Sequence, residues 1–468
     1  MMDARGLAYH FAHWAHGLKL SDMPEAVHMV VRRTMLDTMA VTVAGGASAD
    51  IKKLSGIWPA AGGDSGLATG GMASAETAAL INGSAAHFWD FDDTSYTGIM
   101  HGSAVVFPAV IALAQELGSK EEDALVAFVI GSEIAYVLAD ICTHEHYFNG
   151  WWSTLTFGLV GATAATARLL GCSADQMAQA IGLAAAGAGG GKSVFGTHAK
   201  PFLVGETAQR AITFARYIHG GLTGPSANFH SETGFLHLLN NDVADIKEVE
   251  TLGQRWRLSD PGLLVKRYPV CSAAHAAIDE IARLTFATGL APENIESINI
   301  DIPKLVRISL VHDDPKTPSE AQFSLPFVAA CAVLYGAVRL EDLNSESLQS
   351  TKIQDLMKKV CISEAKDLST DDMLKRYPES ARVRIVLNGS AENEGFCGEA
   401  YGMPKRPLSD EDFLGKVHAC LVFAHGAADI PGILDKGILE LSKGLYGKKP
   451  RDQNVLPIHQ QEVAASAY

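Results

Sequence analysis

The spacing of apolar residues divides the chain into a long helical part and a shorter mixed part. Between residues 24 and 221, apolar side chains recur every three to four positions, which is the period of a helix that buries one face. This pattern predicts helices over 24–46, 104–117, 123–143, 157–171, 173–187 and 206–221. The segments 123–143 and 157–171 are apolar on nearly every side, so we expect them at the centre of a large helical bundle.

Beyond residue 270 the pattern becomes mixed. Residues 295–303 and 381–389 alternate between apolar and polar side chains, which predicts strands. The helical period persists between them, over 273–284 and 323–336. This order of elements indicates an α+β insert and not a series of strand–helix–strand units.

The C-terminal segment returns to helix. Residues 409–424 begin with a capping serine, Ser409, followed by acidic residues. We expect this end of the chain to pack back on the first helices. The sequence therefore predicts a mainly α protein, with a large all-helical domain (1–268 and 405–468) and a smaller α+β domain (269–404).

Composition and charge restrict the class of protein. The chain has 468 residues, 47% of them hydrophobic and only 19% charged, which is ample for a large buried core. Its net charge is −15, so we expect no nucleic-acid partner and no anionic membrane partner. The seven cysteines are scattered and never spaced C-x-x-C, which is typical of reduced thiols and gives no zinc or iron–sulfur signature. With no signal-peptide pattern and no spanning segment, we expect a soluble cytoplasmic protein.

A glycine-rich stretch ends in Gly191-Lys192-Ser193, as phosphate-binding loops do. The first glycine of that motif is missing, because its position holds Ala186, and the preceding residues favour a helix where a strand is needed. We interpret the stretch as a close-packed helix end. The tetrapeptide KRYP occurs twice, over 266–269 and 375–378, but the flanking residues differ and we treat the repetition as coincidence.

The segment 82–109 is the densest in ionisable groups. It contains Asp90, Asp92, Asp93 and Thr94, with His87 and His101 on either side. So many ionisable groups between two apolar helices are costly to bury without a purpose. Three alternatives stay open: a solvated acidic loop with helix caps, a metal site of unspecified geometry, and a terpene-cyclase D-x-D-D-T motif. The last requires an aromatic pocket, and only 7% of the residues are aromatic.

Four blocks of sequence resemble one known family. They are HFWDFDDT with the histidine that follows, FGTHAKPFLVGETAQ (195–209), KRYPVCSAAHAAID (266–279) and, more weakly, LDTMAVTVAG (36–45). In this order they resemble the MmgE/PrpD family, which includes 2-methylcitrate dehydratases, cis-aconitate decarboxylases and iminodisuccinate epimerase. The resemblance implies a large helical domain plus a smaller α+β domain, and homodimers that need no cofactor. It also implies an active site between the two domains.

Residues at matching positions form the candidate site. The resemblance implies Lys200, His101, His275 and Asp90 as catalytic residues, and Thr94, Asp93, Trp152, Lys266 and Phe327 as substrate-binding residues. The implied substrate is a small polycarboxylate, with no metal and no organic cofactor. A lysine and histidines can hold carboxylates and stabilise the charge that develops when a neighbouring carbon loses its proton. A histidine can act as the general base or acid.

Each of these residues also has a structural alternative. His101 precedes a predicted helix and could only cap it. His275 lies on an amphipathic helix and could be a core histidine with satisfied hydrogen bonds. Lys200 could only extend to the surface.

The chain departs from the family at several positions. Trp152 stands where dehydratases and decarboxylases have a histidine, and Phe327 where decarboxylases have a tyrosine; Leu203, Glu206 and one extra residue before His101 are further differences. Two proton donors are lost, which weakens the prediction of an elimination and is compatible with an epimerisation. We predict a lyase first, an epimerase of an iminodisuccinate-like substrate second, and a non-catalytic nucleotide- or carboxylate-binding protein as the alternative from another class.

Overall fold

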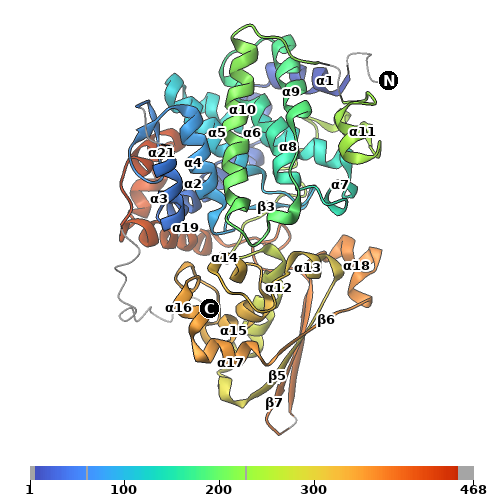
Figure 1. The fold of residues 1–468 in the computed structure, drawn as a ribbon, viewed down its shortest axis with the longest axis vertical. Helices are drawn as coiled ribbons and strands as arrows, with labels where there is room; N and C mark the ends of the chain where they lie inside the picture. Colours follow the sequence, from blue (N-terminus) through green and yellow to red (C-terminus); the bar gives the residue numbers. More distant parts are fainter. Residues whose placement is uncertain (1–5, 59–61, 227–228, 390, 452–468) are drawn as a thin grey trace.

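A computed structural model describes residues 6–58, 62–226, 229–389 and 391–451, which form two units stacked one on the other (Figure 1). The large unit is a helical bundle from both ends of the chain. Its helices are α1 (Gly6–Gly17), α2 (Glu25–Gly46), α3 (Ala49–Ile57), α4 (Ala75–Phe88), α5 (Gly102–Leu117), α6 (Glu121–Cys142), α7 (Glu145–Phe148), α8 (Ser153–Leu169), α9 (Ala174–Gly187), α10 (Ala199–His219), α11 (Phe235–Asn240), α19 (Asp410–His425), α20 (Ile430–Leu434) and α21 (Ile438–Tyr446). Two short strand pairs join it: β1 (Ser65–Gly66) with β2 (Met72–Ala73), and β3 (Thr94–Ser95) with β4 (Leu263–Leu264).

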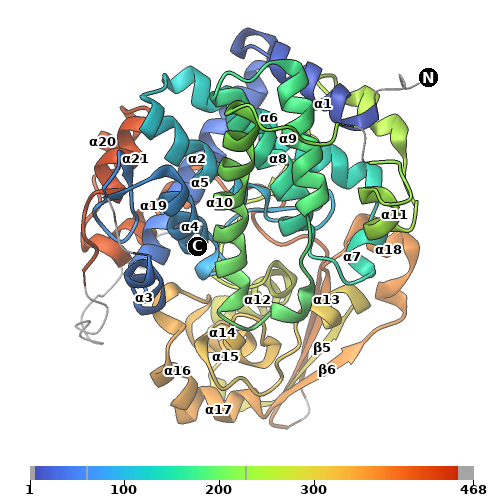
Figure 2. The ribbon, with the colours of Figure 1, turned by 45° about the horizontal axis from the view of Figure 1, so that its top comes forward.

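The small unit combines a sheet with helices (Figure 2). Its four strands lie in the order β6 (Val360–Glu364), β5 (Ile295–Ile302), β7 (Ala381–Leu387) and β8 (Glu392–Cys397). Only β5 and β6 are parallel; the other neighbours are antiparallel. The helices are α12 (His275–Leu284), α13 (Lys304–Ser309), α14 (Pro318–Ala321), α15 (Leu325–Tyr335), α16 (Ser345–Gln349), α17 (Thr351–Met357) and α18 (Asp371–Arg376). Helix α12 packs on β7 and β8, and α15 packs on α12.

This architecture confirms the predicted fold class, a large helical part plus a smaller α+β part. The predicted central helices correspond to α6 and α8, which pack against each other in the core. Helix α6 is long and apolar enough to cross a membrane, but 89% of its most apolar 18-residue window is buried, as expected for a core helix. Ser409 caps α19 by accepting a hydrogen bond from the Asp412 N–H, and α19 packs on α2. The exact domain boundaries stay a prediction.

The packing of α4 against α10 positions the site. A Cβ atom on Gly205 of α10 would lie 2.0 Å from the carbonyl oxygen of Leu80 in α4, so only glycine permits this approach. Helix α10 begins at Ala199 and not near residue 206 as predicted, because Pro201 is tolerated in a first turn, where its missing N–H has no helical partner. The close contact therefore places Lys200 beside the C-terminal end of α4, where His87 lies.

Candidate active site

The centre of the site is a buried lysine–carboxylate pair. Lys200 donates hydrogen bonds from Nζ to Oδ1 of Asp90 and, at 2.6 Å, to Nε2 of His87. A second ammonium, that of Lys266, donates to Oδ2 of Asp90 at 2.8 Å and to its backbone carbonyl at 2.6 Å. Burial alone would raise the pKa of Asp90, but the two ammonium groups hold it well below its usual range. Asp90 is therefore ionised and neutralises part of the lysine charge.

The backbone around Asp90 explains how the two lysines reach it. Asp90 has a φ of +48°, in the left-handed region that aspartate tolerates better than most residues, so the chain turns sharply after α4. The following strand β3 pairs with β4, with Thr94 opposite Leu264. This pairing brings Lys266, two residues beyond β4, against Asp90.

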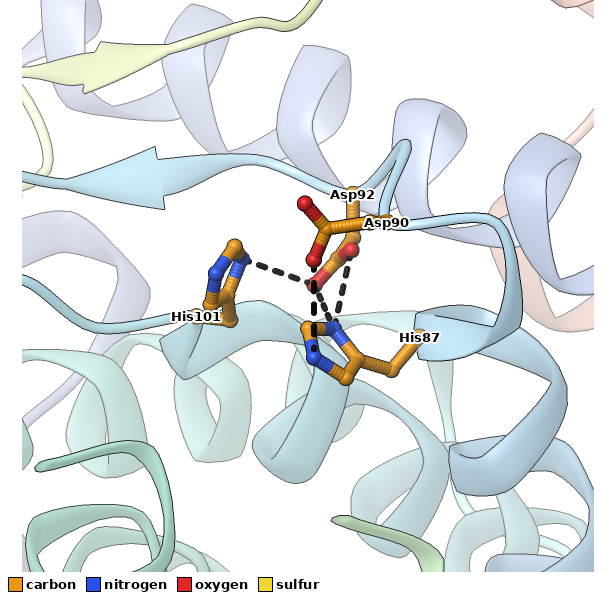
Figure 3. Close-up of side chains that lie close together, drawn as sticks. All are labelled: His87, Asp90, Asp92 and His101. Atoms are coloured by element: carbon orange, nitrogen blue, oxygen red, sulfur yellow. Dashed lines mark hydrogen bonds and ion pairs between the residues drawn. The ribbon is translucent and has the colours of Figure 1, made fainter. Parts of the chain in front are cut away.

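The hydrogen bonds of His87 determine its tautomer. A lysine ammonium can only donate, so Nε2 of His87 accepts from Lys200 and Nδ1 carries the proton. That Nδ1–H donates to Asp92 Oδ2 at 2.8 Å (Figure 3). Burial lowers the pKa of His87 to about 4, although Asp92 opposes the change. His87 is thus a neutral acceptor that orients the Lys200 ammonium.

His101 is also held through its Nδ1, but its Nε2, unlike that of His87, is not bonded to Lys200. Its Nδ1 lies 2.9 Å from the carbonyl oxygen of Asp93 and 3.1 Å from Asp92 Oδ2, both of which are acceptors. Nδ1 therefore carries a proton, which in the neutral ring leaves the lone pair on Nε2. The residue occupies the N-cap position of α5 but makes no capping hydrogen bond with its side chain. Its role is therefore not that of a helix cap.

A pocket opens between the two units around these groups. The large unit contributes Asp90, Thr94, Ile99, His101, Tyr147, Trp152, Phe195 and Lys200. The small unit and the segment leading into it contribute Cys271, Ser272, Ser309, Phe323 and Glu379. Three aromatic rings surround the Lys200 ammonium: Nζ lies 5.0 Å from the ring centroid of Phe323 and 5.3 Å from those of Trp152 and Phe195. This apolar surround strengthens the attraction between the ammonium and an anion that enters the pocket.

The predicted site residues fall into two groups. Asp90, Thr94, His101, Trp152 and Lys200 line the pocket. The other four predicted residues, Asp93, Lys266, His275 and Phe327, lie behind the pocket wall and not among its lining residues.

These four have structural surroundings of their own. Burial raises the pKa of Asp93 to about 8, and neither of its carboxyl oxygens has a hydrogen-bond partner among the described residues. Burial and the nearby Lys266 lower the pKa of His275 to about 3, and its Nε2–H points to the carbonyl oxygen of Val270 at 3.4 Å. Phe327 is fully buried in α15, and Phe323, just before that helix, supplies the aromatic wall instead.

The sequence did not identify several residues of the site. His87 and Asp92 were noticed only as neighbours of the acidic segment, although they fix the orientation of Lys200 and His101. Tyr147, Phe195, Ser272, Ser309, Phe323 and Glu379 were not identified at all. Glu379 follows directly on the second KRYP tetrapeptide, whose occurrence carried no signal of a pocket.

Four side chains of the site have metal-binding atoms. His87, Asp90, Asp92 and His101 each offer one such atom, all within 4.8 Å of one another (Figure 3). Two of these residues, His87 and Asp90, already bind the Lys200 ammonium. A metal ion would have to displace that ammonium, so the donor set fits the lysine better than a metal. That no metal is needed stays a prediction.

The surroundings of the glycine-rich stretch that ends in Gly191-Lys192-Ser193 differ from those of a phosphate-binding loop. It follows α9, and a short 3-10 turn spans Lys192–Val194. The Lys192 ammonium lies over the ring of Tyr147, 3.7 Å from its centroid, and does not line the pocket. Lys200, and not Lys192, therefore faces the pocket.

Comparison with known proteins shows the family of this chain. Cis-aconitate decarboxylase from Mus musculus is 24% identical over 434 residues, covering 89% of this chain and 87% of that protein. The Homo sapiens cis-aconitate decarboxylase is 25% identical, covering 89% and 88%. That of Aspergillus terreus is 23% identical, covering 88% of each chain. The family model for the MmgE/PrpD N-terminal domain matches residues 9–245, and the model for the C-terminal domain matches 268–430. The chain therefore belongs to the MmgE/PrpD family.

Proposed function

We propose that the protein is a lyase that acts on a small di- or tricarboxylate, by breaking a bond next to a carboxylate group. The observation that carries the proposal is the Lys200 ammonium. It donates two of its three protons, to His87 and Asp90, and three aromatic rings of the pocket lie within 5.3 Å of the ammonium nitrogen. A substrate carboxylate is the partner that this buried cation lacks among the described residues.

The neighbouring groups supply the remaining chemistry. Thr94 Oγ1 lies in the pocket wall and can donate a hydrogen bond to the same carboxylate. When a proton leaves the adjacent carbon, or when carbon dioxide leaves, negative charge develops next to Lys200, and a cation fixed in place stabilises it without reorganising. Nε2 of His101 has the lone pair that a general base needs. His87, Asp92 and Lys266 act on the substrate only through the residues they hold.

Proton NMR of the enzyme in D2O tests the proposal. The panel is 2-methylcitrate, citrate, cis-aconitate and the stereoisomers of iminodisuccinate, with the heat-inactivated enzyme as the control. A new alkene signal or loss of carbon dioxide supports the lyase. No change in any compound, in enzyme that is folded by circular dichroism, contradicts it.

An epimerase is the second candidate, and Trp152 is the observation that favours it. Trp152 lines the pocket, at a position where the resemblance to the family implies a histidine in dehydratases and decarboxylases, and it offers no proton to a leaving group. Deuterium entering the α-carbon together with interconversion of stereoisomers, without an alkene, supports this candidate. The aromatic wall also favours a substrate less charged than citrate. We propose further that the enzyme is a cytoplasmic homodimer without a cofactor; light scattering of the purified protein tests the dimer.

A further inference from the structure

An elimination or decarboxylation also needs a proton donor. Most of the ionisable groups that line the pocket are unsuited to this role. Asp90 is ionised, His101 has its Nδ1 proton directed away at acceptors, and Lys200 is bonded to a carboxylate. Burial raises the pKa of Cys271 to about 12 and also raises that of Tyr147, so both are weak acids. One lining group is left, the carboxyl group of Glu379.

Glu379 lies in the small unit, between α18 and β7, and lines the pocket. The residue is only 3% exposed. Both carboxyl oxygens are fixed: the Tyr96 hydroxyl donates to Oε2 at 2.7 Å, and the Ser272 hydroxyl donates to Oε1 at 2.9 Å. Tyr96 belongs to the large unit, so the Glu379 side chain is held from both sides of the pocket.

The burial of Glu379 favours its protonated form. Burial raises the pKa of Glu379; the two hydroxyl hydrogen bonds and Lys266 oppose this change, and the Asp90 carboxylate adds to it. The other titratable groups near it, Cys271 and Tyr147, are neutral at physiological pH. Lys266 is already paired with Asp90. A carboxylate substrate brought into the pocket adds further negative charge and raises the proton affinity of Glu379 again.

We propose that Glu379 is the general acid of this enzyme, protonated when a carboxylate substrate occupies the pocket. In a dehydration, Nε2 of His101 takes the proton from carbon, and the C–H electron pair forms the double bond. The C–O bond breaks towards oxygen, and that oxygen takes the proton of Glu379 and leaves as water. In a decarboxylation, the C–C bond breaks, carbon dioxide leaves, and the electron pair left on carbon takes the same proton. Glu379 ends as a carboxylate and takes a proton from solvent, and after a dehydration His101 releases its extra proton to solvent, so both groups return to their starting states.

This proposal rests on the proposed function, and its first test needs no turnover. Tricarballylate, a saturated tricarboxylate without a leaving group, is titrated into the protein by calorimetry from pH 6 to 9, in two buffers of different ionisation enthalpy. The difference between the buffers measures the protons taken up on binding. We expect uptake that approaches one proton at its maximum in the natural protein and is lost in Glu379→Gln. His101→Asn is expected to keep it.

A second variant covers the case in which Glu379→Gln does not fold. Tyr96→Phe removes one hydrogen bond that favours the ionised carboxyl, so the pH of maximal proton uptake is expected to move upward. A curve that is unchanged in both variants, or one that His101→Asn alone abolishes, overturns the proposal.

Turnover provides the second readout with whichever compound of the panel reacts. Glu379→Gln is expected to lower kcat about 100-fold or more and to leave KM within a few-fold, which is typical of a lost general acid. Glu379→Asp should keep part of the rate, and Glu364→Gln, an exposed glutamate at the end of β6, should keep all of it. Full activity in Glu379→Gln overturns the role of Glu379 alone. Absence of both binding and turnover in the natural protein overturns the proposed function, and this proposal with it.

Discussion

Replacing Lys266 by methionine tests whether the charge arrangement beneath the pocket is correct. The Lys266 side chain is fully buried, and its ammonium makes two hydrogen bonds to Asp90, one to the carboxylate and one to the backbone carbonyl. Methionine fills a similar volume but leaves both oxygens without that donor. We therefore expect a large loss of stability together with a loss of activity.

The expected loss of stability depends on the partner that Asp90 retains. Removing one partner of a buried ion pair costs about 3–5 kcal/mol, because the remaining charge is left uncompensated. Asp90 retains Lys200 as a partner, so Lys266→Met is expected near the lower end, about 3 kcal/mol. Adding Asp90→Asn removes the uncompensated charge, and the double variant should be more stable than the sum of the single losses by about 2 kcal/mol.

Urea unfolding, followed by both tryptophan fluorescence and circular dichroism, measures these values. The two probes must give the same transition before a free energy is derived, because proteins of this size often unfold in more than one step. Lys352→Met, an exposed lysine of α17, is the matched control and should stay within about 0.5 kcal/mol. A loss below about 1 kcal/mol for Lys266→Met, or strict additivity in the double variant, refutes the reasoning.

Three further predictions follow from the site. Lys200→Ala should abolish turnover of the reacting compound in folded protein, whereas Lys192→Ala should do much less; equal activities contradict the assignment. His101→Asn keeps a donor near the Nδ1 position but has no Nε2, so kcat should fall about 100-fold or more while the melting temperature changes little. Asp93→Asn should gain stability relative to the natural protein as pH rises from 5 towards 8, by up to about 1.4 kcal/mol per pH unit. The sign follows from the pKa of Asp93, which is raised from 3.8 to about 8 in the folded protein. Between these two values the folded state holds a proton that the unfolded state has lost, so the natural protein loses stability as pH rises, and the Asn variant does not. A flat difference between the two unfolding curves contradicts this last prediction.

The sequence predicted the elements whose signal is local. The spacing of apolar residues predicted that α6 and α8 lie in the core, and the capping serine, Ser409, predicted the start of α19. The edge strands β6 and β8 were not predicted, because most of their residues are exposed or half-buried and lack the regular apolar alternation of β5. Their pairing depends on neighbours that are distant in the sequence.

Phe327 and Phe323 show where the resemblance to the family did not predict the lining of the pocket. The resemblance assigned Phe327 to the substrate, but Ser324 caps α15 by accepting a hydrogen bond from the Phe327 N–H. The cap puts Phe327 inside the helix, facing the core, and leaves Phe323 outside it, facing the pocket. Glu379 could not be identified either, since its hydrogen bond to Tyr96 joins residues 283 positions apart.

The division of groups between the two units has a consequence for how the site is assembled. The cation, Lys200, and the proposed base, His101, belong to the large unit, while the proposed acid, Glu379, belongs to the small one. The Tyr96–Glu379 hydrogen bond links the two units at the pocket itself, so a contact between the units also favours the ionised form of the acid. A change at this contact therefore acts on Glu379, since the hydrogen bonds of Lys200 and His101 involve neither Tyr96 nor Glu379. Tyr96→Phe should in consequence shift the pH dependence of turnover while leaving carboxylate binding by Lys200 intact, a separation that a purely structural role for Tyr96 would not produce.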